Sequence, residues 1–419
     1  MPMPKLLILS HVFPFPRKAG QQQRVYYTIK ALREFFHITF LGISEHAFAK
    51  DMQEKLSIAC NDVIILSARY SQSQIGRVWH KVAGICYSAY TGLKFSNYVI
   101  GKLELNPSRL DPLFKSTHFD CALFEYWHAV DSTTVFHQRG IPAVLDTHDV
   151  LWQSYERDLN AKPILPTWYK RRAIAAYKQR EEDAWNKFDA LIAINKEEEK
   201  YIRSVIAPET PIFYAPMGVD LDHWSFSWQP ANPPRVAYYG SLGNANRQRD
   251  ALSCYESIMP QIWQTCPNTE FWIIGADPPP MICSLASDPR VKVTGYVERV
   301  QDILKTISII LCPWTGTYGF RSRLVEVMAL GVPVVASPEA TYGMDLDVGR
   351  GIFLEETLEG MGRVSIGLLT NAPTLREQSH LARVQVESKF GFDATYGRMA
   401  RELYDFTLCN MQRTRKENR

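Results

Sequence analysis

Short runs of apolar residues alternate with longer amphipathic stretches along the first half of the chain. The amphipathic stretches, such as 23–36 and 196–206, predict helices. The apolar runs predict buried strands at residues 5–10, 38–43, 62–66, 120–124, 142–146 and 188–194. Strands that alternate with helices in this way indicate a doubly wound parallel sheet.

The same alternation starts again after a break. The break comprises residues 215–220 and a proline-rich connector at 229–234. Beyond it, the pattern predicts helices near 250–265 and 321–330 and strands at 235–239, 269–275, 291–295, 307–312 and 332–336. The sequence therefore predicts an α/β protein with two domains. Ligands of open α/β sheets bind at the carboxyl ends of the strands, so we expect a cleft between the domains.

Length and composition agree with this interpretation. A chain of 419 residues exceeds what one hydrophobic core usually serves. The net charge of +3 is too small to indicate a nucleic-acid partner. The eight cysteines form no C-x-x-C pair, which favours reduced thiols over a disulfide framework or a zinc site. With no signal-peptide core and no long apolar segment, we expect a cytoplasmic protein without a spanning helix.

The most informative segment runs from Gly319 to Ser337. It places Arg321 and Arg323 at the start of a predicted helix, where unpaired N–H groups and the helix dipole favour an anion. Glu326 follows among apolar residues, where an unpaired carboxylate is costly to bury. Phosphates at one end of a ligand and ribose hydroxyls at the other would suit both features, as in a sugar nucleotide. The alternative is a surface helix on which Glu326 pairs with Arg323.

A glycine- and arginine-rich loop follows the first strand of the second half. Gly240, Arg247 and Arg249 lie in it and are suited to wrap a diphosphate. The loop lacks the G-x-G-x-x-G pattern, which weakens a nicotinamide or flavin interpretation. A basic surface loop is the alternative, above all for Arg249. Tyr296 ends another predicted strand and is placed to border a base.

Polar residues also follow the strands of the first half. Gly20 lies in a proline-stiffened loop, where it lets the backbone approach a ligand. His148 follows the strand 142–146 beside Asp149, a carboxylate that we expect to hold its tautomer. For His11 and His128 we expect structural roles. The histidines lack the i, i+4 spacing of a zinc motif, so we expect no metal.

Taken in order, these segments resemble family 4 of the retaining glycosyltransferases, which have the GT-B fold. They are especially similar to bacterial sugar transferases of exopolysaccharide assembly. The resemblance implies an acceptor-side Rossmann-like domain over residues 1–215, completed by a last helix within 392–419, and a nucleotide-sugar-binding domain over 216–391. It is carried by the loop to Gly20 and by residues 147–149, 216–220, 240–242, 293–296 and 323–336.

The resemblance implies a role for each candidate residue. Glu326 would bind the ribose, with Gly240, Arg321 and Tyr296 also on the donor side. Arg323 and either Arg247 or Arg249 would hold the diphosphate. His148 would contact the donor sugar, and Gly20 would border the phosphates or the acceptor. The implied reaction moves a sugar from a UDP- or GDP-conjugate to a glycan or lipid-linked acceptor with retention and without a cofactor; the residues assigned to catalysis are His148, Arg323 and Arg247.

Two positions depart from the family's pattern. The family has a second glutamate eight residues before Glu326, where this chain has Tyr318. Ser241 stands where an arginine is common. These departures leave two alternatives open, a sugar-nucleotide epimerase of the same fold and a non-catalytic protein that binds nucleotide sugars.

Two stretches combine aromatic and basic residues. They are residues 77–102, which include Trp79 and Lys81, and residues 162–180, which include Trp168 and Arg171. Such helices can lie on an anionic membrane surface. The alternative is a helix with one packed face and one solvated face. Contact with the inner face of a membrane is therefore one of two interpretations.

Overall fold

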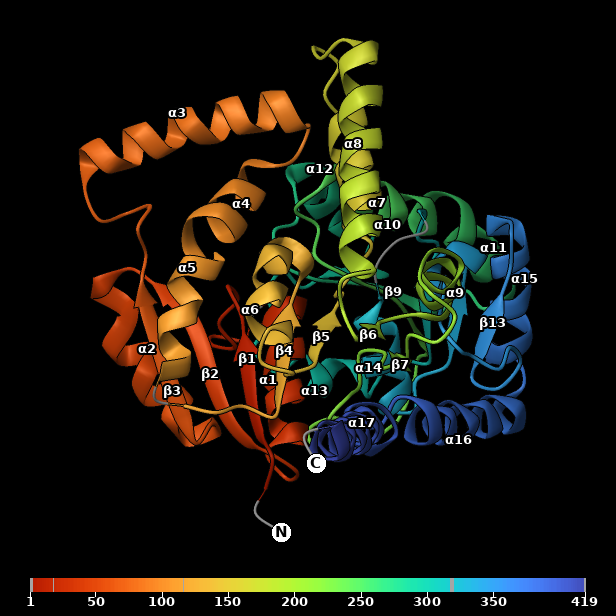
Figure 1. Cartoon of the computed structure of the whole chain (residues 1–419). Helices are drawn as coiled ribbons and strands as arrows, with labels where there is room; N and C mark the ends of the chain where they lie inside the picture. The colour runs from red at the N-terminus through yellow and green to blue at the C-terminus, as the bar shows by residue number, and fades with distance from the viewer. Residues whose placement is uncertain (1–2, 18, 116, 317–319, 418–419) are drawn as a thin grey trace. The chain divides into compact units, whose positions relative to one another are not determined.

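The computed structural model describes residues 3–17, 19–115, 117–316 and 320–417. The chain divides into two compact units (Figure 1). Unit 1 contains residues 1–215 and 396–419, and unit 2 contains residues 216–395. Each unit is built on one parallel sheet with helices packed against it, so the predicted α/β fold with two Rossmann-like domains is confirmed.

The sheet of unit 1 has seven strands in the order β3-β2-β1-β4-β5-β6-β7, all pairs parallel. The central strands read as unbroken apolar runs because helices cover both faces of a parallel sheet. The strands are β1 (Lys5–Leu9), β2 (His37–Ser44), β3 (Asp62–Ser67), β4 (Cys121–Glu125), β5 (Ala143–Asp146), β6 (Ala190–Ala193) and β7 (Ile212–Tyr214).

The sheet of unit 2 has six parallel strands in the order β10-β9-β8-β11-β12-β13. The five strands predicted for this half are present, although most are shorter than their apolar runs. They are β8 (Arg235–Tyr239), β9 (Glu270–Ile274), β10 (Val291–Val293), β11 (Ile309–Cys312) and β12 (Val334–Ala336), and the sequence did not predict β13 (Ile352–Leu354).

The helices of unit 1 include two that stand away from its sheet, α3 (orange) and the first half of α8 (yellow) (Figure 1). Between α3 and β4 the chain forms a π-helical segment, η1 (Tyr98–Glu104), and after β4 a 3-10 segment, η3 (Trp127–Ser132). The α-helices of unit 1 are α1 (Gly20–Leu32), α2 (His46–Ala59), α3 (Gln74–Thr91), α4 (Phe95–Asn97), α5 (Pro107–Leu110), α6 (Thr133–His137), α7 (Leu151–Asn160), α8 (Thr167–Trp185), α9 (Lys196–Val205) and α17 (Arg398–Glu417).

In unit 2, the helix predicted near 250–265 is divided by a π-helical turn into α10 (Ala245–Ser253) and α11 (Met259–Thr265). The helix predicted at 321–330 is α14 (Ser322–Ala329), and it joins β11 to β12. Leu324, Val327 and Met328 bury one face of α14 in the core of this unit. The others are α12 (Pro280–Cys283), α13 (Val300–Leu304), α15 (Leu358–Leu369) and α16 (Ala372–Lys389).

The chain passes between the units twice, and in unit 1 each passage is fixed to α1. Arg24 donates from Nη1 to the carbonyl oxygen of Ala215, the last residue before the first passage, at 2.8 Å. Tyr396, the first residue after the second passage, packs its ring against that of Tyr27, with centroids 5.6 Å apart. Both Arg24 and Tyr396 are buried, so the two passages end in the core of unit 1.

Candidate functional site

A cavity of about 190 Å³ lies in unit 2 at the carboxyl ends of β8, β9 and β10. This is the edge of a parallel sheet at which ligands of α/β proteins bind. The cavity brings together three of the predicted site residues, Gly240, Tyr296 and Arg323. It is lined by Tyr239, Gly240, Ser241, Ile274, Gly275, Ala276, Gly295, Tyr296, Val297, Val300 and Arg323.

Two glycines form part of this lining with their backbones. A Cβ atom added at Gly275 would lie 1.8 Å from the carbonyl oxygen of Gly240, so the ends of β8 and β9 approach too closely for any side chain there. A Cβ added at Gly240 would lie 3.1 Å from the hydroxyl oxygen of Tyr238. Peptide groups therefore border the cavity directly, as expected where a ligand approaches the backbone.

The two arginines at the start of α14 have different surroundings. Arg321 donates from Nη2 to the carbonyl oxygens of Thr315, at 3.3 Å, and Gly316, at 3.0 Å, so it holds the loop that follows β11. Arg323 lines the cavity, and its guanidinium lies 5.5 Å from the centre of the Tyr239 ring. Arg323 is therefore the arginine that faces the cavity, whereas Gly319 and Tyr318 lie outside the described residues.

Glu326 lies one turn after Arg323 on α14 and is partly buried. Within the described part of the chain its carboxylate accepts no hydrogen bond and forms no ion pair, so the predicted alternative of a pair with Arg323 is not formed. Burial raises the pKa of Glu326 to about 7, and the positive charge of Arg323 opposes that shift only in part. Glu326 also contributes to the raised pKa of Tyr239, so the three side chains are neighbours. A partly buried carboxylate without a partner is costly unless a ligand supplies one.

Arg247 and Arg249 lie on α10, which begins where the Asn244 side chain accepts from the Arg247 backbone N–H at 3.0 Å. Neither arginine lines the cavity. Both lie near the buried carboxyl of Asp250, whose pKa burial raises to about 6 against the charges of Arg247, Arg321 and Arg249. The structure thus gathers three predicted cations around Asp250, a residue that the sequence did not single out.

His148 follows β5 in unit 1 and is buried, with a positive φ of 59°. Its Nε2 bonds the Oε2 of Glu125, and its ring stacks on Tyr126 with centroids 4.1 Å apart. The prediction that Asp149 holds the tautomer of His148 was therefore wrong. Glu125 and Asp146 are paired residues of the adjacent strands β4 and β5, and the left-handed turn at His148 directs its ring back toward β4. The pairing of β4 with β5 was the signal that could have identified Glu125.

A buried ion pair lies beside His148. Arg24 donates to both carboxylate oxygens of Asp146, at distances from 2.7 to 2.9 Å. Glu125, Asp146 and His148 have ligand atoms within 4.8 Å of one another, a spacing that a metal ion could use. The guanidinium of Arg24 is already paired with the carboxylate of Asp146, however, and its positive charge would repel a metal cation. The donor set therefore does not fit a metal site.

The two other histidines near this cluster are uncharged at neutral pH. Burial, together with the charge of His148, lowers the pKa of His11 to about 4. Burial also lowers the pKa of His128. The His11 ring lies 5.1 Å from Tyr126 and 5.3 Å from His128, centroid to centroid. Both rings pack against aromatic neighbours, but Nδ1 of each is buried without a hydrogen-bond partner among the described residues, so the hydrogen-bonded structural role expected for both stays a prediction.

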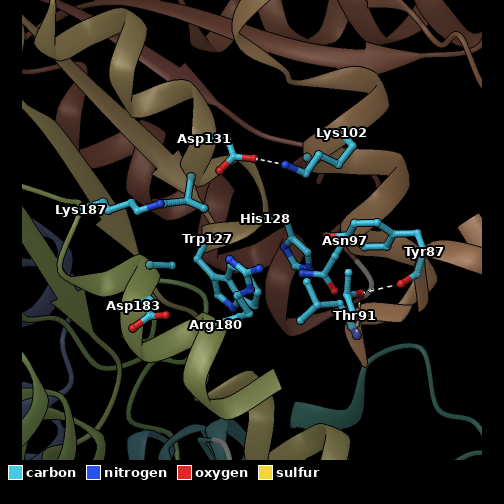
Figure 2. Close-up of a pocket in the computed structure, with 14 residues that line it drawn as sticks. Tyr87, Thr91, Asn97, Lys102, Trp127, His128, Asp131, Arg180, Asp183 and Lys187 are labelled. Atoms are coloured by element: carbon cyan, nitrogen blue, oxygen red, sulfur yellow. Dashed lines mark hydrogen bonds and ion pairs between the residues drawn. The ribbon is translucent and has the colours of Figure 1, made fainter. Parts of the chain in front are cut away.

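Unit 1 also contains a cavity of about 220 Å³ that the sequence did not predict (Figure 2). Its walls come from α3, η1, η3 and α8, segments far apart in the chain, so no local pattern identifies it. Figure 2 shows Lys102 paired with Asp131 on one side and Arg180 beside Trp127 on another. The lining residues that carry charge are Lys102, Asp131, Arg180, Asp183 and Lys187.

The last predicted residue, Gly20, is the first residue of α1, and an added Cβ there would have no atom within 4 Å. Its backbone is therefore open. Gly20 and His148 belong to unit 1, and the seven other candidate residues belong to unit 2.

Comparison with known proteins places this site in context. Residues 233–356 match a family model described as glycosyl transferases group 1. That span includes the whole lining of the unit 2 cavity and Glu326. No curated protein sequence matches the chain.

Solved structures resemble the chain over nearly its whole length. Sucrose-phosphate synthase from Thermosynechococcus elongatus has a TM-score of 0.61 at 15% identity, covering 97% of this chain and 99% of that one. Anabaena HepE, in complex with UDP and glucose, has a TM-score of 0.59 at 15% identity, covering 96% and 100%. S. aureus TarM has a TM-score of 0.64 at 11% identity, covering 97% and 99%. The chain thus has the GT-B fold that the sequence predicted.

Proposed function

We propose that the protein is a glycosyltransferase that binds a sugar nucleotide at the cavity of unit 2. The observation that carries this proposal is the partly buried carboxylate of Glu326 beside Arg323, which has no partner among the described residues. Two ribose hydroxyls would supply the hydrogen bonds that Glu326 lacks, and Arg323 would contact the diphosphate. The match of residues 233–356 to the family model supports the same conclusion.

The proposed reaction follows from the charges that develop. The bond between the anomeric carbon and the diphosphate oxygen breaks, which leaves negative charge on the diphosphate. Arg323 and the N–H groups at the start of α14 would stabilise that charge by preorganised electrostatics, with Arg247 and Arg249 contributing from α10. The acceptor oxygen forms the new bond on the same face of the sugar, and its proton passes to the departing diphosphate. His148 would contact the donor sugar.

We propose a UDP- or GDP-sugar as donor, and a glycan or lipid-linked glycan of surface polysaccharide or glycolipid assembly as acceptor. HepE, which shares the fold, binds UDP and UDP-glucose. A cytoplasmic location at the inner face of a membrane is part of the proposal. All eight cysteines are free, which agrees with a reducing compartment. Within the described residues, no helix is long and apolar enough to cross a membrane.

Thermal unfolding in the presence of individual UDP- and GDP-sugars tests the proposal. We expect one conjugate to raise the Tm of the protein and to lose that effect in Glu326→Gln. Nucleotide should then be released faster when a glycan acceptor is added. Conversion of the donor without an acceptor would indicate an epimerase, and binding without turnover would indicate a non-catalytic partner. If no conjugate shifted the Tm, the proposal would be wrong.

A further inference from the structure

Helix α3 turns its apolar face away from the protein. Gly84 marks the packed face, because a Cβ there would lie 2.3 Å from the Phe95 ring. The opposite face carries exposed apolar residues at helical spacing. Ile75 is 85% exposed and Trp79 is 69% exposed, and Val78, Val82, Ile85 and Tyr90 are also exposed. α3 thus has one packed face and one exposed face, and the exposed face carries most of its large apolar residues.

A second group of exposed apolar residues lies where α7 joins α8. Ile164 is 93% exposed and Trp168 is 67% exposed. The end of α3 contacts the middle of α8, since a Cβ at Gly92 would lie 3.0 Å from the side chain of Ala176. Figure 1 shows α3 and the first half of α8 on the same side of the unit 1 sheet. The two groups thus belong to one end of unit 1.

Lysine and arginine predominate around both groups. Residues 71–103 contain four lysines and arginines, residues 161–180 contain six, and neither segment contains an aspartate or glutamate. Four of these ten cations are paired with carboxylates of other segments: Arg77 with Glu45, Lys94 with Asp158, Lys102 with Asp131 and Lys178 with Glu182. Glu181, which follows directly, does not dilute this charge at the surface. It is buried and accepts from the backbone N–H groups of Leu151 and Trp152.

We propose that α3 and residues 162–172 form a surface by which unit 1 lies on an anionic lipid bilayer. Exposed apolar side chains would enter the headgroup region, and the flanking lysines and arginines would bind anionic headgroups. Charge favours this occupant over a second copy of the chain, because α3 and residues 162–172 contain six lysines and arginines and no aspartate or glutamate, so two copies would place like charges against each other. The inference rests on the proposed function only in that it places the acceptor at a lipid surface.

Flotation of the full-length protein with vesicles tests the surface directly. Vesicles of phosphatidylcholine alone are compared with vesicles that also contain phosphatidylglycerol, at low and at high salt. We expect binding to the anionic vesicles at low salt and weaker binding at high salt, because salt screens exposed charges. Each basic residue near an anionic surface contributes about a fivefold change in partitioning, so Lys81→Glu with Arg171→Glu and Arg172→Glu should weaken binding about 100-fold.

A second variant separates apolar insertion from charge. Trp79→Ser with Val82→Ser keeps every charge and should also weaken binding. The matched controls are Arg376→Glu and Val384→Ser, both exposed on α16 of unit 2, and they should bind as the unaltered protein does. Because Cys86 is exposed on α3, an environment-sensitive fluorophore attached there, with Cys283 and Cys409 replaced by serine, should report a less polar surrounding on binding.

Several results would overturn the inference. The protein would fail to bind anionic vesicles, or the α3 variants would bind as well as the α16 controls do. Alternatively, the fluorophore on Cys86 would report an aqueous surrounding even when vesicles are present. Concentration-dependent dimerisation abolished by Trp79→Ser would show that a second copy covers the face instead. Sugar-nucleotide binding is measured separately on the same variants. If the protein floated with vesicles but bound no donor, the membrane surface would stand and the proposed sugar transfer would be wrong. If it bound donor but did not float, the transfer would stand and the membrane surface would be wrong.

Discussion

At the scale of single residues, Arg323 lines the unit 2 cavity and Glu326 lies one turn further along α14. The sequence predicted that Glu326 needs a partner, because its neighbours on the helix are apolar. It could not predict that Arg321 holds a loop while Arg323 faces the cavity, because both arginines begin the same helix. It also missed Glu125, since the contact with His148 depends on the register of β4 against β5.

Replacing Glu326 with glutamine should stabilise the ligand-free protein in a pH-dependent way. The folded pKa of about 7 lies above the ordinary value of 4.5, so ionisation opposes folding at high pH. The gain in the free energy of unfolding should reach as much as about 3 kcal/mol above pH 7 and disappear as pH falls toward 4.5. Urea unfolding at pH 8 and pH 5 measures it. The exposed Glu356→Gln is the control, and a gain that did not change with pH would contradict the assignment.

Replacing Arg323 with alanine should reduce turnover and spare folding. Loss of one preorganised donor to a developing anion typically costs about 100-fold or more in turnover. The Tm should stay close to that of the unaltered protein, because Arg323 is only partly buried. Steady-state release of nucleotide measures the effect, with Arg299→Ala, an exposed arginine of the same unit, as control. Turnover within a few-fold of normal would remove Arg323 from the proposed mechanism.

At the scale of elements, apolar runs predicted the strands of both sheets except β7 and β13, which have three residues each. β10 and β12 are equally short, but the runs that predicted them extend beyond the strands, over residues 291–295 and 332–336. The basic-aromatic stretch 77–102 reads as one helix in the sequence. In the structure α3 ends at Gly92, which adopts a φ of 75°, and the chain continues as α4 and η1. A glycine alone does not predict such an end, because glycines also occur inside helices, as Gly84 does.

The close approach of β8 and β9 makes Gly275 sensitive to the smallest substitution. Gly275→Ala should lower the free energy of unfolding by about 1–3 kcal/mol, because the clash at 1.8 Å is with backbone and forces the strand ends apart. Affinity for the sugar nucleotide should fall with it. Gly367→Ala is the matched control: it lies in α15 with open space around it and should raise stability by about 0.5–1 kcal/mol. Equal effects of the two substitutions would refute the argument.

At the scale of the whole molecule, the repeated alternation of strands and helices was enough to predict two α/β domains. The lining of either cavity was not predictable in full. The residues of the unit 2 cavity come from four segments spread over 85 residues, from Tyr239 to Arg323. The sequence identified Gly240, Tyr296 and Arg323 as candidate residues of this site. Ile274, Ala276 and Val300 line the same cavity with side chains that are common in any core.

Thiol accessibility tests the packing of both units at once. Cys86, Cys283 and Cys409 are exposed and should react rapidly with a thiol reagent, and Cys266, partly buried, more slowly. The four buried cysteines should react only after denaturation. Burial raises the pKa of Cys60 and Cys121 to about 12, so their reactive thiolate is scarce even if the reagent enters. Mass spectrometry counts the modified thiols, and rapid native modification of more than four would show looser packing.

Helix α1 joins the anchoring of both chain passages to the cluster beside His148. Arg24 fixes the carbonyl of Ala215, and the Tyr27 ring, one turn along the same helix, packs on Tyr396. The guanidinium that fixes Ala215 also holds Asp146, two residues from His148. A single substitution at Arg24 would consequently release a connecting segment and a buried carboxylate together.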